Sequence, residues 1–158
     1  MADKLVRPDK ILVSSCLLGE RVRYDGGDNE LLHPLLLQWK REGRLISFCP
    51  ECAGGLSTPR APAERVGSRV LTKEGVDVTP QFIDGADQAV ELAKAAGVKV
   101  AILKARSPSC GSGAIYDGNF AKRLIEGNGV TTDALTAAGV KVFCEDELEE
   151  LARFLKED

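Results

Sequence analysis

The chain has 158 residues, of which 44% are hydrophobic and 28% are charged, and its formal net charge is −3 at pH 7. This length and composition are those of an ordinary globular protein with one full-sized core, so we expect a single domain over residues 1–158. Binding to a long nucleic acid requires many clustered Lys and Arg side chains, whereas here the basic residues are scattered among acidic ones. The composition therefore favours a small-molecule substrate over a long nucleic acid.

The apolar segments of the sequence are short. Residues 1–10 are polar and charged, whereas a signal peptide carries an apolar core segment. The longest apolar runs are far shorter than the roughly 20 residues that a membrane-spanning helix requires. We therefore expect a cytoplasmic protein that does not associate with membranes, and a monomer is the default expectation for its oligomeric state.

Four short apolar runs predict buried strands, at residues 10–16, 45–49, 98–104 and 140–144. Residues 50–64 contain three prolines and two adjacent glycines, which predicts a long irregular loop of the kind that is usually functional. A small hairpin is predicted next, with strands at 69–71 and 76–78 around a turn at 72–75.

Four helices are predicted between and after these strands. The first is capped by Asp28 or Asn29, carries apolar residues from Leu32 to Trp39 at helical spacing and ends at Gly43. The others cover 79–97, where Thr79 and Pro80 open the helix, 131–138, and a C-terminal segment with Leu148, Leu151, Ala152 and Leu155 on one face. Strands that alternate with helices predict an α/β domain of Rossmann-like layering, with a mainly parallel sheet and flanking helices.

The chain has five cysteines, namely Cys16, Cys49, Cys52, Cys110 and Cys144, and a single histidine, His33. Disulfides are rare in a reducing compartment, and an odd number of cysteines resists complete pairing. A mixed Cys/His zinc site has only His33 to draw on. The remaining interpretations are a thiolate-bound metal or cluster, a reactive thiol, and buried cysteines that act as small hydrophobic residues.

The cysteines fall where predicted strands end. Cys16, Cys49 and Cys144 each end one strand, and Cys110 lies in the loop that leaves the third strand. In open parallel sheets, ligands bind beyond the carboxyl ends of the strands. The residues around Cys49 and Cys110 are rich in Gly, Pro and Ser, which allow close backbone approach and offer N–H groups to a ligand. Placement and flanking residues together favour one shared site.

The Cys49-Pro50-Glu51-Cys52 spacing permits a rival interpretation as a thioredoxin-like redox pair. Such motifs sit at the start of a helix, and Ala53-Gly54-Gly55-Leu56 is a poor beginning for one. A four-cysteine zinc site is disfavoured because it usually needs two short-spaced pairs, and the chain has one.

Three ordered blocks of residues carry a family resemblance. The first is Cys16-Leu17-Leu18-Gly19 with 22–26; the second is Cys49-Pro50-Glu51 with 54–56, 58–60 and 62–64; the third is Ser107-Pro108-Ser109-Cys110-Gly111 with 115–118 and 127–130. In these blocks the chain resembles the thiouracil desulfidases, a family long catalogued as a domain of unknown function. The resemblance extends over about 11–144, which is nearly the whole chain.

The resemblance implies a 4Fe–4S cluster held by three cysteines, here Cys16, Cys49 and Cys110. One iron would then lack a protein ligand and act as a Lewis acid toward the sulfur of a small thiolated pyrimidine such as 2-thiouracil. Sulfur would leave to that iron while water replaces it on the pyrimidine carbon. The expected products are uracil and sulfide, with no net redox change.

Desulfuration of this kind needs a proton shuttle, and two residues beside the cysteines are the candidates. Glu51 is the first and Ser107 the second. The alternative interpretations are a loop salt bridge for Glu51, with Arg60 as its partner, and a turn or cap for Ser107. The residues expected to border the substrate pocket are Tyr24, Asp25, Arg60 and Ser109, whereas Asp117 is interpreted as a turn former.

Cys52 departs from the family pattern, which has an aliphatic residue at this position. It is either a fourth ligand, which would close the cluster, or a thiol that points away from it, and we favour the second interpretation. Cys144 is interpreted as a core residue at a strand end. Two alternatives to a desulfidase stay open, a non-catalytic cluster or metal carrier and a dithiol oxidoreductase that uses Cys49 and Cys52.

Overall fold

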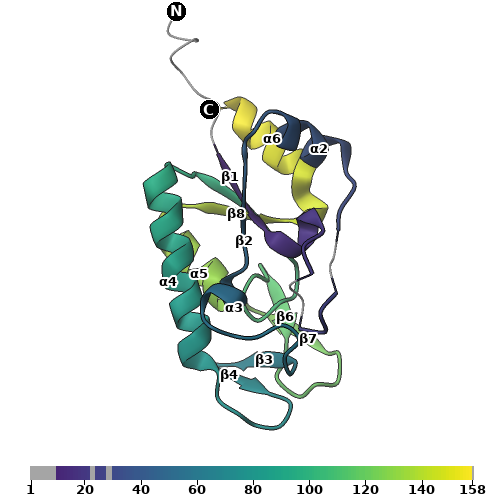
Figure 1. Ribbon diagram of the computed structural model, residues 1–158, viewed down its shortest axis with the longest axis vertical. Helices are drawn as coiled ribbons and strands as arrows, with labels where there is room; N and C mark the ends of the chain where they lie inside the picture. The colour runs from purple at the N-terminus through teal and green to yellow at the C-terminus, as the bar shows by residue number, and fades with distance from the viewer. Residues whose placement is uncertain (1–9, 22–23, 28–29, 158) are drawn as a thin grey trace, which may run out of the picture.

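The computed structural model describes residues 10–21, 24–27 and 30–157. Its centre is a four-stranded sheet in the order β2-β1-β5-β8 (Figure 1). The strands are β1 (Ile11–Ser14), β2 (Leu45–Phe48), β5 (Val100–Leu103) and β8 (Lys141–Cys144). All neighbouring pairs in this sheet are parallel, so the four carboxyl ends lie along one edge. The predicted α/β fold with a parallel sheet is confirmed.

Helices cover both faces of the sheet. Along β1, Ile11 and Val13 enter one hydrophobic cluster and Leu12 enters the other, as the alternation of side chains in a strand requires. Helices α2 (Pro34–Arg41) and α6 (Leu148–Glu157) pack on the first face, and α4 (Thr79–Ala96) and α5 (Val130–Ala137) pack on the second (Figure 1). No helix among residues 10–21, 24–27 and 30–157 is both long and apolar enough to cross a membrane.

The first helix starts later than the sequence predicts. It begins at Pro34, and His33 caps it because its Nδ1 accepts a hydrogen bond of 3.1 Å from the Leu35 backbone N–H. Leu32 therefore lies outside the helix and is 72% exposed. The predicted caps Asp28 and Asn29 lie outside the described residues. The proline sets the start because its ring suits the first turn and excludes a longer helix before it.

The predicted hairpin around residues 72–75 is present, because the Thr72 N–H donates to the Val76 carbonyl and the Val78 N–H to the Val70 carbonyl, both at 2.9 Å, about an antiparallel bridge between Leu71 and Asp77. The sequence does not predict that strand β4 (Arg69–Thr72) also pairs along its full length with the preceding β3 (Ala63–Val66). The two-residue connection through Gly67, whose φ of +61° suits a tight turn, closes the β3–β4 hairpin. The segment 63–66 follows directly after the proline-containing stretch, so the sequence gives no clear strand pattern there.

Three further elements lie in stretches that were expected to be loops or were left unassigned. They are a one-turn helix α3 (Pro50–Ala53) and an antiparallel pair of three-residue strands, β6 (Ala114–Tyr116) and β7 (Leu124–Glu126). Short 3₁₀ turns, η1 (Ser15–Leu18) and η2 (Glu145–Glu147), follow β1 and β8. The two hairpins, β3–β4 and β6–β7, lie together at one end of the molecule, below the sheet in Figure 1.

Helix α3 rests directly on the backbone of α4. A Cβ added at Gly85 would lie 1.9 Å from the carbonyl oxygen of Pro50, and one added at Gly54 would lie 1.9 Å from that of Gln81. Only glycine allows backbones to approach so closely. This contact fixes the first turn of α3, which carries Cys49 at its N-cap and Glu51.

Candidate functional site

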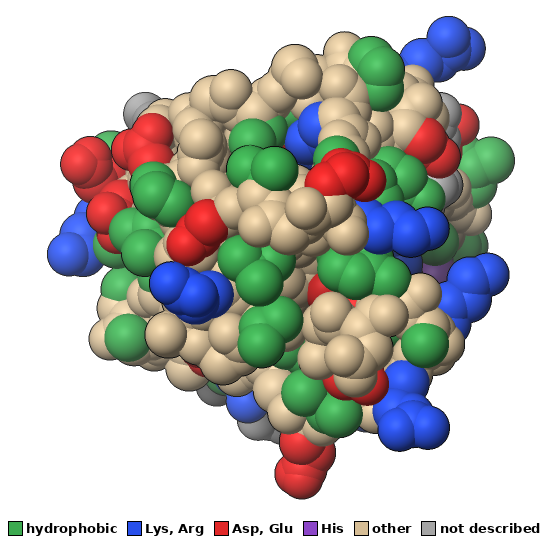
Figure 2. All heavy atoms as spheres, turned by 90° about the horizontal axis from the view of Figure 1, so that it is seen from below, with side chains coloured by type: hydrophobic (Ala, Val, Ile, Leu, Met, Phe, Trp, Pro, Cys, Tyr) green, Lys and Arg blue, Asp and Glu red, His purple; other side chains and the backbone are tan. Residues whose placement is uncertain are grey.

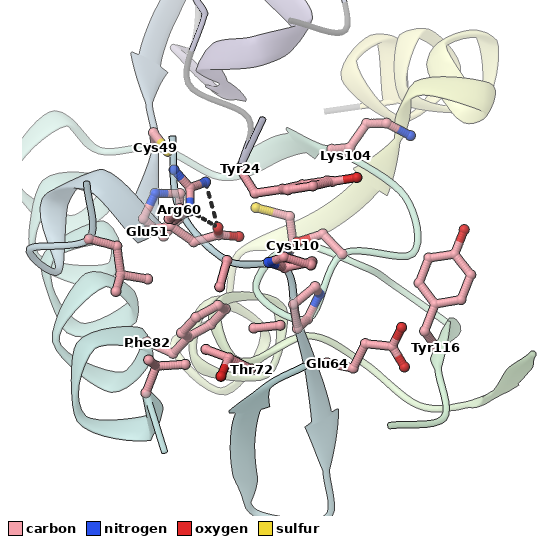
Figure 3. Close-up of a pocket in the computed structure, with 18 of the residues that line it drawn as sticks. Tyr24, Cys49, Glu51, Arg60, Glu64, Thr72, Phe82, Lys104, Cys110 and Tyr116 are labelled. Carbon is pink, nitrogen blue, oxygen red and sulfur yellow. Dashed lines mark hydrogen bonds and ion pairs between the residues drawn. The ribbon is translucent and has the colours of Figure 1, made fainter. Parts of the chain in front are cut away.

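A cavity of about 800 Å³ opens at the edge of the sheet where the strands end. Figure 3 shows its walls, which come from the turns after β1, β2 and β5 and from the two hairpins. Apolar, charged and thiol side chains all contribute to the lining. The labelled residues of the lining are Tyr24, Cys49, Glu51, Arg60, Glu64, Thr72, Phe82, Lys104, Cys110 and Tyr116.

The cavity brings together the three cysteines that the family resemblance singles out. Cys16 lies in η1 directly after β1, Cys49 is the N-cap of α3 directly after β2, and Cys110 lies in the loop after β5. All three line the cavity. They are distant in sequence and converge because β2, β1 and β5 are parallel neighbours whose carboxyl ends share one edge.

Cys110 is the most deeply set of the three thiols, with 6% of its surface exposed. The Ser14 hydroxyl donates a hydrogen bond to its Sγ at 3.5 Å, and Ser14 Oγ accepts one from the Lys104 backbone N–H at 3.0 Å. The loop itself rests on the start of α5. A Cβ at Gly129 would lie 2.3 Å from the carbonyl carbon of Ser109, so this close approach requires glycine.

Burial raises the pKa of the Cys110 thiol to about 12, and the neighbouring Glu51 and Cys16 add to the increase. Burial likewise raises the pKa of Cys49 to about 12. Both groups are therefore neutral thiols at pH 7 when no cation is nearby. A bound metal reverses this preference, because a coordinated thiol loses its proton.

Glu51 and Arg60 form an ion pair on the wall of the cavity (Figure 3). Arg60 Nη2 lies 2.6 Å from Glu51 Oε2, and Arg60 Nε donates to the same oxygen at 2.9 Å. The guanidinium also donates to the Ser57 carbonyl and to Thr58 Oγ1, and the Arg60 backbone N–H donates to the Tyr24 carbonyl at 2.6 Å. The anticipated salt bridge exists, and it holds Glu51 at the cavity.

Ser107 also lines the cavity, and its Oγ accepts hydrogen bonds of 3.0 Å from the backbone N–H groups of both Ser109 and Cys110. The anticipated turn-forming role of Ser107 is therefore present in the structure. It leaves the hydroxyl hydrogen for another acceptor, because both bonds use the oxygen as an acceptor.

Two residues expected to border the pocket are not among the described residues that line it. Ser109 is 0% exposed, and its hydroxyl forms a 2.8 Å hydrogen bond with Thr131 Oγ1. Asp25 is exposed, and its Oδ1 accepts from the Gly27 backbone N–H at 2.9 Å. The expectation for this pair is corrected: Ser109 supports the Cys110 loop from behind, and Asp25 shapes a surface turn. Asp117 forms the predicted kind of turn, accepting from the Asn119 N–H at 2.9 Å.

The two remaining cysteines lie outside the described lining. Cys52 is the third residue of α3, and its Sγ is 3.4 Å from Thr58 Oγ1. The Cys49–Cys52 motif thus does begin a helix, contrary to expectation, although this helix is only four residues long. Cys144 ends β8 and is half-buried.

No three His, Cys, Asp or Glu side chains of the described residues converge closely enough to hold one metal ion. Four thiolates around one zinc ion would have to converge on it at about 2.3 Å each. An iron–sulfur cluster has a different requirement, because each thiolate binds its own iron and the sulfur atoms stay apart.

Sequence reasoning missed several residues of the site. Ser14 was treated as part of an apolar strand, although a polar residue at the end of a buried strand is itself a sign of a functional site. Lys104 lines the cavity and its Nζ lies 2.6 Å from Glu145 Oε2. Glu64, Phe120 and Lys122 also line it. Glu64 belongs to strand β3 and the other two to the loop between β6 and β7, and none of these three strands was predicted.

Comparison with known proteins gives consistent matches over nearly the whole chain. Residues 11–147 match the family model described as 2-thiouracil desulfurase. The uncharacterized protein YbbK of Bacillus subtilis (strain 168) is 40% identical over 153 residues, which cover 89% of this chain and 99% of YbbK. A solved structure described as the [4Fe-4S]-dependent thiouracil desulfidase TudS is 50% identical, with a TM-score of 0.93 over 95% of this chain and 99% of that chain. The chain belongs to the 2-thiouracil desulfurase family.

Proposed function

We propose that this protein removes the sulfur from a small thiolated pyrimidine such as 2-thiouracil, using a 4Fe–4S cluster held by Cys16, Cys49 and Cys110. The convergence of these three thiols on one cavity carries the proposal. Water supplies the incoming oxygen, so that C=S plus H₂O becomes C=O plus H₂S without a change in oxidation state. Family membership and the likeness to TudS support the same activity.

The residues present fit such a cluster. Thiolates are its usual ligands, and three thiols line the cavity from neighbouring strand ends without converging on a single point. Cys52 does not line the cavity among the described residues, and its thiol lies beside both Thr58 and Cys49, so it is not part of the proposed ligand set. When bound, the cluster supplies an iron without a protein ligand, which serves as a Lewis acid for the thione sulfur.

Glu51 holds and transfers the proton in this proposal. Its Oε2 takes both hydrogen bonds from Arg60, which orients the carboxylate and leaves Oε1 to exchange a proton with water or with the departing sulfur. A positioned carboxylate typically contributes a factor of about 10² to 10⁴ to such a step. Glu51 also lies two residues after Cys49, in the first turn of α3. Its carboxylate would therefore transfer protons beside a cluster ligand.

Ser107 orients the reacting water or the substrate. Two backbone N–H groups fix its oxygen, so its O–H points toward a restricted set of acceptors. It lies three positions before the ligand Cys110 in the same loop. Apolar groups of the lining, including Phe48 and Leu56, give the pyrimidine ring a surface to contact.

The experiment is anaerobic reconstitution with iron and sulfide, followed by incubation with 2-thiouracil. We expect about four irons per chain, broad visible absorption, and equal amounts of uracil and sulfide. A protein that takes up the cluster without turning over any thiolated pyrimidine would be a cluster carrier. A protein that takes up no iron and oxidises through Cys49 and Cys52 would be a dithiol oxidoreductase.

The setting of the protein is also part of this proposal. We propose one catalytic domain over 1–158 that works as a cytoplasmic monomer on a small molecule, without a nucleic acid partner or a membrane. All five cysteines are free thiols, which suits a reducing compartment. On the face shown in Figure 2, Lys and Arg side chains lie singly among acidic and apolar ones, unlike the continuous basic surface that nucleic acid binding requires.

A further inference from the structure

Glu64 is a buried carboxylate of the cavity wall that the proposed chemistry does not use. It lies in β3, is 9% exposed and lines the cavity. Its Oε1 accepts hydrogen bonds from the backbone N–H groups of Gly118, at 2.9 Å, and Phe120, at 3.1 Å. A nearly buried carboxylate is costly unless it is hydrogen-bonded, and here its partners all belong to the loop between β6 and β7.

That loop has a backbone that needs outside support. Gly118, Phe120 and Lys122 have φ values of +96°, +56° and +60°. Residues with a Cβ seldom adopt this left-handed conformation, yet Phe120 and Lys122 both do. The two hydrogen bonds to Glu64 fall on Gly118 and Phe120 themselves, so the carboxylate stabilises the disfavoured segment directly.

The loop is also docked against β3 by its backbone. A Cβ at Gly118 would lie 2.5 Å from Val66 Cγ2, so the turn passes directly over this strand. The neighbouring Arg65 holds the other side of the hairpin, because its Nη1 donates to the Asn128 carbonyl at 2.6 Å and contacts Asp133 Oδ2 at 2.7 Å. Of the β3 residues that contact the loop, Glu64 lines the cavity.

The side chains that the loop presents are part of the cavity lining. Phe120 and Lys122 line it together with Tyr116 at the start of the loop. In Figure 3, Glu64 and Tyr116 lie at the end of the cavity away from Cys49. In the same view, this end of the cavity also lies away from Glu51.

We propose that Glu64 is a positioning residue for substrate recognition, acting through the loop that carries Phe120 and Lys122. The inference rests on the proposed function. It assigns to Glu64 the shape of the end of the substrate pocket at which no bond changes. Loss of the two hydrogen bonds releases the loop and weakens substrate binding. It leaves the cysteines, Glu51 and Ser107 in place, so the chemical step is unaffected.

The test compares Glu64→Ala and Glu64→Gln with the wild-type holoenzyme. We expect Glu64→Ala to raise KM for 2-thiouracil about tenfold while kcat stays within about twofold, because a contact made equally in the bound substrate and in the transition state changes KM alone. Glu64→Gln keeps a carbonyl oxygen at the same place and restores KM. Glu91→Ala, which removes an exposed carboxylate of α4, is the matched control and leaves both constants unchanged.

Amide hydrogen exchange gives a measurement that does not depend on turnover. In Glu64→Ala, exchange at Gly118 and Phe120 should be faster by about tenfold or more, with no change at Cys110, and Glu64→Gln should retain protection. Phe120→Ala should also raise KM. The double variant with Glu64→Ala should add little to the larger single effect, because the two residues act through one contact.

Three outcomes would overturn the inference. They are a wild-type KM in Glu64→Ala despite faster exchange, a fall in kcat equal to the rise in KM, and full additivity with Phe120→Ala. If Glu64→Ala does not fold, Glu64→Asp, which is one methylene too short to reach both N–H groups, takes its place in each comparison. Absence of turnover by the wild type would instead contradict the proposed function, and loop exchange would still decide whether Glu64 holds the loop.

Discussion

The Arg60 guanidinium contacts a single carboxylate oxygen of Glu51, with Nη2 at 2.6 Å and Nε at 2.9 Å from Oε2. Arg60 and Glu51 side chains are only 9% and 17% exposed, so the pair is shielded from solvent more than a surface salt bridge. Its arrangement joins the α3 turn, which carries Glu51, to the irregular segment before β3. The pair therefore orients a potential proton carrier while it closes part of the wall.

The first prediction concerns the proton carrier. Glu51→Gln keeps an oxygen for Arg60 but cannot carry a proton between water and sulfur. We expect kcat for 2-thiouracil to fall by about 10² or more with iron content unchanged, as measured by sulfide release and iron analysis. The control is Glu42→Gln, which disrupts the exposed contact with Arg44 at 3.4 Å. A Glu51→Gln variant that retains wild-type kcat would remove Glu51 from the mechanism.

A second prediction assigns the cluster ligands. Alanine at position 16, 49 or 110 should each reduce bound iron and visible absorption to a small fraction of the wild-type value after anaerobic reconstitution. Cys52→Ala and Cys144→Ala should retain about four irons per chain, because neither thiol lines the cavity among the described residues. Loss of iron in Cys52→Ala would show that Cys52 is a ligand and that the cluster has no open iron.

The third prediction concerns the support of Cys110. Ser14→Ala removes the hydroxyl that donates to Cys110 Sγ and accepts from the Lys104 N–H, and it leaves that N–H without this acceptor. We expect the free energy of unfolding of the cluster-free chain to fall by about 1–3 kcal/mol, measured by urea denaturation. Ser68→Ala, at an exposed position of the β3–β4 turn, should change it by less than about 0.5 kcal/mol. Equal values for the two variants would contradict this account of Ser14.

Cys144 gives a prediction about pH. Burial raises the pKa of its thiol to about 11, and the carboxylates of Glu147 and Glu145 add to the increase. The native state therefore keeps a proton that the unfolded chain releases near pH 9, so the contribution of Cys144 to stability is complete below pH 9 and declines toward pH 11. Because the thiolate is the nucleophile, we expect iodoacetamide at pH 8 to alkylate Cys144 at least about tenfold more slowly in native than in urea-unfolded protein.

Peptide mass analysis at increasing times follows this alkylation. Glu147→Gln should speed the reaction of native Cys144, since it removes one carboxylate that disfavours the thiolate. Glu149→Gln, an exposed change in α6, is the control. Equal rates in native and unfolded protein would show that the Cys144 thiol is not protected by its surroundings.

Much of this site could be anticipated from local sequence signals. Apolar runs that end in Cys16 and Cys49 predicted two strand ends, and the alternation with helices predicted a parallel sheet. The loop after the third strand then brings Cys110 to the same edge. Thr79-Pro80 and Gly97 marked the limits of α4 to within a residue. These signals are local, because caps, breakers and hydrophobic periodicity act within a few residues of each other.

The errors arose where local signals were weak or competed. Strands β6 and β7 have three residues each, too few to show an alternating pattern. Strand β3 follows Pro59 and Pro62 directly and was not predicted, and its pairing with β4 depends on a tight turn at Gly67. The start of the first helix was decided by His33 and Pro34 rather than by the apolar periodicity around Leu32.

The sequence by itself determined the fold class, the three candidate cluster ligands and the nearby acid Glu51, because their signals lie in short contiguous motifs. Only the tertiary structure decided what surrounds them. Ser14 reaches Cys110 across 96 positions of the chain, and Glu64 reaches Gly118 across 54. Such contacts depend on how strands and hairpins pack in space, and a pattern confined to neighbouring residues carries no information about that packing.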